Sequence, residues 1–202
     1  MKNMLVHDLQ LKGRSPSGMA QNTFEVPGAM TTAHVLGWIG TYAQSQNGLN
    51  NLFIMCHGYE QGIEDPNALV STYALGYGLA LGTPGLTFDN VRLTSAWNGN
   101  VGIITLFACG PANTRPGYQN TYGDGMRFCG ELALISGADV IAAVESQIYY
   151  INQSWWDSLV GNEGVIDFGD WEGTVYRFSS VDGTAEKIAK GPSSGASCKI
   201  KI

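Results

Sequence analysis

The 202-residue chain contains three apolar runs without alternation, at 52–56, 101–108 and 140–144. They are rich in Ile, Leu, Val and Phe and carry few polar residues. Runs of this kind are typical of strands that are buried on both faces of a parallel sheet. We therefore predict a central, mostly parallel sheet that contains these three strands.

Apolar residues at helical spacing predict helices before, between and after these strands. The predicted helices cover 31–45, 126–136 and 153–160, and a short helix is expected to begin at Thr87. Gly137 is expected to end the second of them. The alternation of strands and helices indicates an α/β fold.

The two ends of the chain show different patterns. Alternating residues from 5 to 11 predict a first strand near a sheet edge, with Asp8 on its polar side. The segments 13–28 and 111–125 are predicted loops, and 73–81 a further strand. Two short β segments around Asp182-Gly183 predict a C-terminal β-hairpin. We expect a single domain over 1–202, with its core at about 31–160 and the hairpin and tail at 171–202.

Composition excludes several classes of protein. Apolar residues make up 44% of the chain and charged residues 14%, with 11 Lys and Arg against 17 Asp and Glu and a net charge of −6. We expect no nucleic-acid or membrane partner, because both need a concentrated basic surface or a long apolar span. The N-terminus shows no signal peptide, so a cytoplasmic location is expected. The oligomeric state is not indicated.

Two of the apolar runs stop at a reactive side chain that glycine follows. The first ends at His57-Gly58 and the second at Cys109-Gly110. The carboxyl ends of neighbouring parallel strands meet at one edge of a sheet, so these side chains can lie side by side. A histidine can activate a thiol and protonate a leaving amine. The N–H groups of Gly58 and Cys109 can face a developing oxyanion.

The chain resembles the caspase-like cysteine peptidases, most closely their CHAT-type branch. The resemblance covers about 36–144 and rests on His57-Gly58, Leu86-Thr87-Phe88-Asp89-Asn90, Phe107-Ala108-Cys109 and Ile135-Ser136-Gly137-Ala138-Asp139-Val140. The spacing of about fifty residues between the histidine and the Ala-Cys pair is a known caspase feature. The resemblance implies a three-layer α/β/α caspase-like fold and endopeptidase activity on a protein or peptide substrate, without metal or other cofactor. It implies His57 as general acid and base, Cys109 as nucleophile, and the Gly58 and Cys109 amides as oxyanion hole.

Three residues are candidate substrate contacts. The first is Phe107, two positions before the proposed nucleophile. In some relatives that cleave after basic residues, an Asp at this position binds the Lys or Arg side chain of the substrate. Glu145 follows the third apolar run and is a candidate for the substrate pocket. Trp155, with its neighbour Trp156, is expected either to wall a substrate cleft or to pack in the core.

Two other functions remain open at this point. A catalytically inactive caspase-like domain would act as a binding or scaffolding module, and an acyl transferase would use the same Cys-His pair without hydrolysis. The four cysteines match no CxxC pattern, and we expect them to be reduced. Cys56 and Cys129 are expected in the core, so no zinc site is predicted. His7 and His34 are expected to be structural.

Overall fold

The computed structural model of the protein describes residues 2–58 and 76–189. Its centre is a seven-stranded sheet with the order β12-β11-β8-β7-β3-β1-β2. The strands of this sheet are β1 Lys2–Asp8, β2 Asn22–Val26, β3 Leu49–Met55, β7 Val101–Phe107, β8 Asp139–Ala143, β11 Val175–Phe178 and β12 Ala185–Ile188. The first residues of the strand predicted at 73–81 and most of the predicted C-terminal tail lie outside the described residues.

Four helices and two smaller sheets complete the described chain. The helices are α1 Thr32–Ser45, the 3-10 helix η1 Val91–Trp97, α2 Gly125–Ser136 and α3 Trp155–Leu159. The strands of the smaller sheets are β4 His57–Gly58, β5 Gly78–Ala80 and β6 Leu86–Thr87 in one, and β9 Tyr150–Asn152 and β10 Val165–Asp167 in the other.

The central sheet is mostly parallel, as the sequence predicted. β2, β1, β3, β7 and β8 run parallel, and β11 pairs antiparallel with β8. β11 and β12 form the predicted C-terminal hairpin at one edge. The apolar runs form the central strands β3, β7 and β8 because both faces of these strands are covered.

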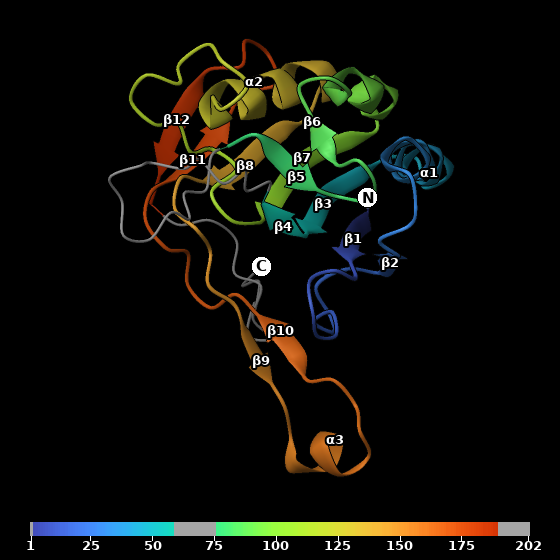
Figure 1. The fold of residues 1–202 in the computed structure, drawn as a ribbon. Helices are drawn as coiled ribbons and strands as arrows, with labels where there is room; N and C mark the ends of the chain where they lie inside the picture. Colours follow the sequence, from blue (N-terminus) through green and yellow to red (C-terminus); the bar gives the residue numbers. More distant parts are fainter. Residues whose placement is uncertain (1, 59–75, 190–202) are drawn as a thin grey trace.

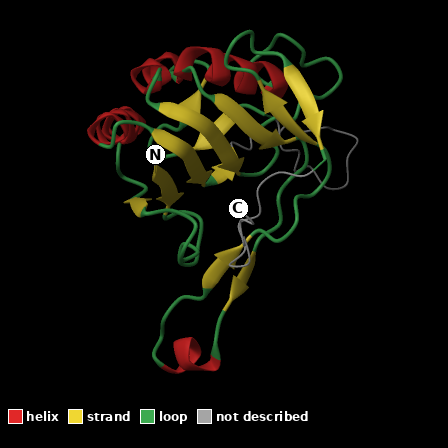
Figure 2. Ribbon diagram, turned by 180° about the vertical axis from the view of Figure 1, so that it is seen from behind, coloured by secondary structure: helices red, strands yellow, loops and turns green. Residues whose placement is uncertain are grey.

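The two faces of the sheet are covered in different ways. α1, η1 and α2 lie on one face, as Figures 1 and 2 show, and their apolar residues join one large core cluster with the strands. The other face holds a smaller cluster that includes Phe53 and Phe107 from the sheet and Leu11, Ile166 and Phe168 from outside it. Within the described residues this second face is covered by loops and β10, so a three-layer α/β/α arrangement is not confirmed.

The predicted helices α1 and α2 are present, and side chains satisfy the free N–H groups at their first turns. Thr31 accepts a hydrogen bond from the backbone N–H of His34 at the start of α1. Asp124 does the same for Arg127 at the start of α2. Burial raises the pKa of the Asp124 carboxyl, but its hydrogen bonds outweigh this effect and the pKa is lowered. Gly137 ends α2 with φ of 65°, a conformation that favours glycine.

The N-terminal prediction needs two corrections. β1 is not half-exposed: residues 4 to 8 are all buried, including Asp8. Both faces of the strand are covered, since Met4 and Val6 belong to the large core cluster and Leu5 to the cluster on the other face. β2 lies within the segment 13–28 that was predicted to be loop. Its Thr23 and Glu25 are exposed while Phe24 and Val26 face inward, the alternation expected of an edge strand.

A third correction concerns the short helix expected from Thr87. Leu86–Thr87 instead forms β6, which pairs with β5, and the 3-10 helix begins only at Val91. Asn90 explains the delay, because its side chain binds the backbone of Thr87 and Gly85 and closes a turn before the helix. None of the helices in the described ranges is long and apolar enough to cross a lipid bilayer.

Candidate active site

The candidate site lies at the carboxyl edge of the central sheet, where three adjacent parallel strands end. Gln10 comes two residues after β1, His57 two residues after β3, and Cys109 two residues after β7. β3 runs between β1 and β7, so the chain segment of His57 lies between the other two. This edge is where open α/β sheets commonly place their sites.

Gly58 brings the histidine segment against the cysteine segment. A Cβ atom placed on Gly58 would lie only 2.0 Å from the carbonyl oxygen of Cys109 and 3.2 Å from its Cα. Unbonded carbon and oxygen atoms normally stay about 3.3 Å or more apart, so only glycine permits this approach. The sequence had predicted that these two strand ends meet, and their backbones are in contact.

His57 is held from the side of β1. Its Nε2 lies 3.3 Å from the carbonyl oxygen of Gln10. A carbonyl oxygen can only accept a hydrogen bond, so this contact places the proton on Nε2 and leaves the lone pair of a neutral imidazole on Nδ1. In this tautomer Nδ1 is the atom that can accept a proton.

Asp8 fixes the position of Gln10, and sequence reasoning missed this role. Its Oδ1 accepts a hydrogen bond from the backbone N–H of Gln10 at 2.9 Å, and its Oδ2 accepts one from the N–H of Gly82 at 2.7 Å. Asp8 is fully buried, and a buried carboxylate needs such partners. The alternating pattern had assigned Asp8 to a solvent-facing side, and only the contact with Gly82, 74 residues later in the chain, reveals its burial.

Cys109 lies at a tight turn that β8 supports. Gly110 has φ of 51°, which favours glycine, and its N–H donates to the carbonyl of Glu145 at 3.2 Å. The Cys109 Sγ lies 3.8 Å from the carbonyl oxygen of Gln147. Gln147 is buried and its side chain binds the backbone of Glu145 and Glu172. The turn around the thiol is therefore fixed by contacts on the β8 side.

The three described cysteines have different environments. Cys109 is half-buried, whereas Cys56 and Cys129 are buried in the core, as predicted. Burial raises the pKa of the Cys56 thiol, and the nearby Asp8 and Cys109 raise it further. Burial also raises the pKa of Cys129, with a smaller effect of Asp124. Both buried cysteines are therefore held as unreactive thiols, and Cys198 lies outside the described residues.

Of the two histidines predicted to be structural, His7 has structural surroundings, whereas the His34 side chain is exposed. His7 is buried, and its ring nitrogens contact the Leu11 carbonyl at 2.9 Å and the Ser15 hydroxyl at 3.0 Å. These bonds tie the segment after β1 to the sheet. His34 is exposed on α1.

Phe107 does not have the position expected of a substrate contact. Its side chain is only 1% exposed and packs against Phe53, Phe168 and Trp171 in the smaller core cluster. Phe107, two residues before Cys109, is therefore a core residue, and its prediction as a substrate contact is wrong. Glu145 is exposed and its side chain lies beside Gly173, so its contact with a substrate stays a prediction.

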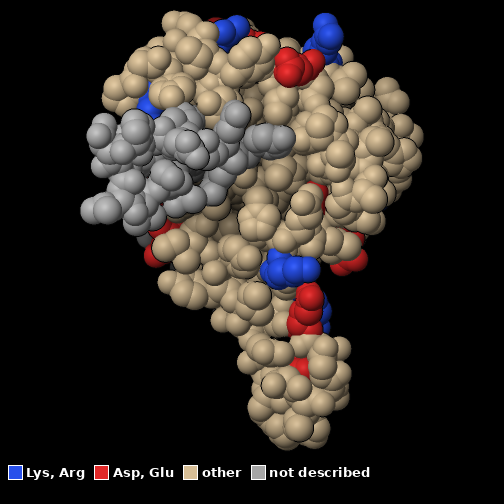
Figure 3. Space-filling view, in the orientation of Figure 1, with Lys and Arg blue, Asp and Glu red and all other residues tan. Residues whose placement is uncertain are grey.

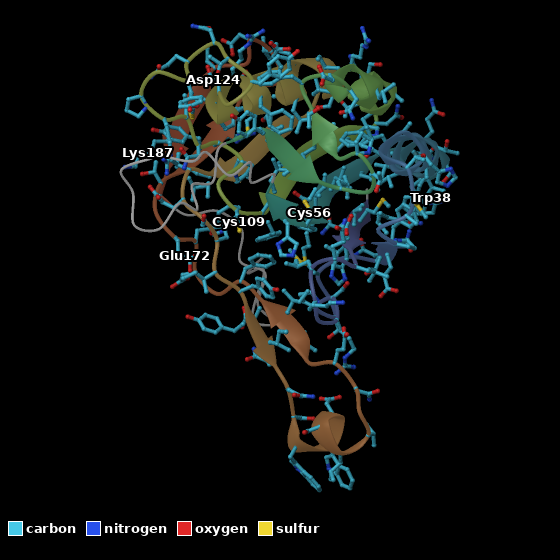
Figure 4. All side chains as sticks on the ribbon, viewed as in Figure 1. Trp38, Cys56, Cys109, Asp124, Glu172 and Lys187 are labelled. Carbon is cyan, nitrogen blue, oxygen red and sulfur yellow. The ribbon has the colours of Figure 1, made fainter. Side chains whose placement is uncertain are left out.

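Trp155 lies far from Cys109, which corrects both predictions made for it. α3 is at the outer end of a projecting arm, while Cys109 and Cys56 lie in the body of the molecule (Figures 1 and 4). Trp155 is 63% exposed and Trp156 61%, so they wall no cleft around the thiol and do not pack in the core.

Comparison of the chain with protein-family models, curated proteins and solved structures gives no match. Residues 2–58 and 76–189 contain no group of three His, Cys, Asp or Glu side chains that could hold a metal ion. The chemical interpretation of the site therefore depends on its residues and their arrangement. That arrangement combines a half-buried thiol, an oriented imidazole and closely packed backbone amides.

Proposed function

We propose that the protein is a caspase-like cysteine endopeptidase that cleaves a protein substrate with Cys109 as nucleophile and His57 as general acid and base. The main support is the contact between Gly58 and the backbone of Cys109, which joins the two strand ends that carry these side chains. The mostly parallel sheet and the position of both residues at its carboxyl edge agree with this proposal.

The proposed reaction has two steps. The Cys109 proton passes to Nδ1 of His57, and the thiolate attacks the carbonyl carbon of the scissile peptide bond. The Gly58 and Cys109 N–H groups stabilise the oxyanion of the tetrahedral intermediate, each donor typically contributing about 2.7–4 kcal/mol. His57 then gives its proton to the leaving amine, the C–N bond breaks, and a thioester remains on Cys109.

Water completes the cycle. His57 takes a proton from a water molecule, which attacks the thioester and releases a carboxylic acid while the Cys109 thiol regains its proton. The Gln10 carbonyl stabilises the imidazolium that forms twice in this cycle, because it accepts the Nε2 proton. Asp8 acts as a positioning residue for Gln10. The chemistry uses no metal or organic cofactor.

Analysis of the reaction products tests this proposal. The purified protein is incubated with a mixture of unrelated proteins, and new N-termini are sequenced by mass spectrometry. A peptidase produces new N-termini at defined sites. Substrates that are acylated but uncleaved would instead support an acyl transferase, and unchanged substrates together with an unmodified Cys109 would support the inactive binding module. Either of these results contradicts the proposal.

A further inference from the structure

The arm, defined here as residues 149–168, projects from the body of the protein and ends in an exposed apolar surface. β9 and β10 form its antiparallel stem, and α3 lies at its outer end (Figures 1 and 2). Ile166 and Phe168 at its root are buried in the smaller core cluster. The arm is therefore anchored in the smaller core cluster while its end reaches into solvent.

The tip, defined as Trp155, Trp156, Leu159 and Val160, is apolar and open. These four side chains are 61–67% exposed. The two indole rings stack with their centroids 4.0 Å apart. Tryptophan is the residue type most enriched among those that dominate binding energy in protein interfaces. A contiguous apolar surface at the end of a projecting arm marks an interaction site.

The tip is held in a fixed shape before any partner binds. Ser154 and Asp157 form a reciprocal cap at the start of α3. Arg14 crosses from the N-terminal segment and donates to the Asp157 carboxylate at 2.9 Å and to the Glu163 carbonyl. The Arg14 backbone also pairs with Gly164 and with Ile166 on β10. An ordered binding surface loses less conformational entropy on association.

The charges of the arm indicate the chemistry of the partner. The chain has no Lys or Arg between 128 and 176, whereas the arm carries Asp157, Glu163 and Asp167. Arg14 pairs with Asp157, and Lys12 lines the same hollow as Glu163. These three acidic and two basic side chains keep a small negative excess, in line with the net charge of −6 of the whole chain. Figure 3 shows the end of the arm as a surface almost without charge, with acidic and basic groups nearer its root. An anionic membrane or a second acidic copy of this chain would be repelled, and a basic partner attracted.

We propose that the tip docks into an apolar pocket of a partner protein whose rim carries Lys or Arg side chains. The stacked tryptophans would fill the pocket, and Glu163 and Asp167 would face the basic rim. This inference does not depend on the chemistry of Cys109, and it gives the exposed tryptophans a role that neither the core nor the candidate active site provides.

A library of random peptides displayed on phage tests this inference. Peptides are selected on the wild-type protein and depleted on the double variant W155S/W156S, and the affinity of those that remain is measured by fluorescence anisotropy. The variant should fold, because both side chains are exposed, and circular dichroism checks this. Val181→Ser is the matched control, because Val181 is 87% exposed on the β11–β12 turn away from the arm.

We expect the retained peptides to combine aromatic or aliphatic residues with Lys and Arg. They should bind wild type and V181S equally, bind W155S/W156S at least about tenfold more weakly, and lose affinity as salt is added. Retained peptides that are acidic, or a selection that finds no difference between wild type and W155S/W156S, would overturn the inference. So would binding of phosphatidylcholine vesicles, or self-association of the protein, that the double substitution abolishes.

Discussion

Replacing Cys109 by alanine is expected to lower the rate of peptide cleavage by at least about 10³-fold, because no thioester can form without the thiol. The expected loss is large since the nucleophile and its base act as a unit, and the remaining groups can only bind and polarise the substrate. The rate is measured on a peptide whose cleavage site is known from the N-termini that wild type produces. Cys109 is half-buried at a turn, so the truncation leaves the core intact.

Cys56→Ala is the matched control for this prediction. Cys56 is adjacent to His57 in the chain, but its thiol is buried and its pKa is raised, so it is not available for attack. The Cys56 variant should cleave within a few-fold of the wild-type rate. Full activity in Cys109→Ala, or a complete loss of activity in a folded Cys56→Ala, would contradict the assignment of Cys109 as the nucleophile.

Replacing Gly58 by alanine is expected to damage both the fold and the site. The added Cβ would lie 2.0 Å from the Cys109 carbonyl oxygen, so the two backbone segments must separate. Overpacking of this kind typically costs about 1–3 kcal/mol in the free energy of unfolding. A displacement of about 1 Å between reacting groups can lower the rate about 10²-fold. Denaturant unfolding and cleavage rates measure the two effects separately.

Gly37→Ala provides the control for this substitution. Gly37 is an exposed residue of α1, and a Cβ placed there meets no other atom within 4 Å. Alanine should stabilise this helix by up to about 1 kcal/mol and leave cleavage unchanged. If Gly58→Ala matched Gly37→Ala in stability and activity, the close contact between Gly58 and Cys109 would be ruled out.

The sequence predicted correctly the strands that are buried on both faces and the two long helices. β3, β7 and β8 followed from their apolar runs, and α1 and α2 from helical spacing and cap residues, because these signals are local. The meeting of the two strand ends also followed, since neighbouring parallel strands place their carboxyl ends at one edge. The position of His57 and Cys109 on that edge needed no knowledge of side-chain contacts.

Features that depend on long-range pairing were not predictable in the same way. β2 is a short edge strand between glycine- and proline-rich segments. Asp8 is buried where the chain around Gly82 packs against it, a contact between residues distant in the sequence. The contact that orients His57 is made by the backbone carbonyl of Gln10. Every residue has a backbone carbonyl, so no residue type in the sequence could indicate this contact. Trp155 and Trp156 were expected to wall a substrate cleft or to pack in the core, yet the arm carries them into solvent.

The rate at which iodoacetamide alkylates each cysteine between about pH 5 and 9 tests the central claim most directly, in wild type and in His57→Ala. The Cys109–His57 pair predicts that wild-type Cys109 reacts rapidly near pH 6, because the imidazolium stabilises the thiolate and lowers the pKa of the thiol. Removing His57 should return that pKa towards about 8.5 and reduce the rate near pH 6 at least about tenfold, while Cys56 and Cys129 stay unreactive. If the alkylation rate of Cys109 depends on pH in the same way in wild type and in His57→Ala, the proposed Cys109–His57 pair is contradicted.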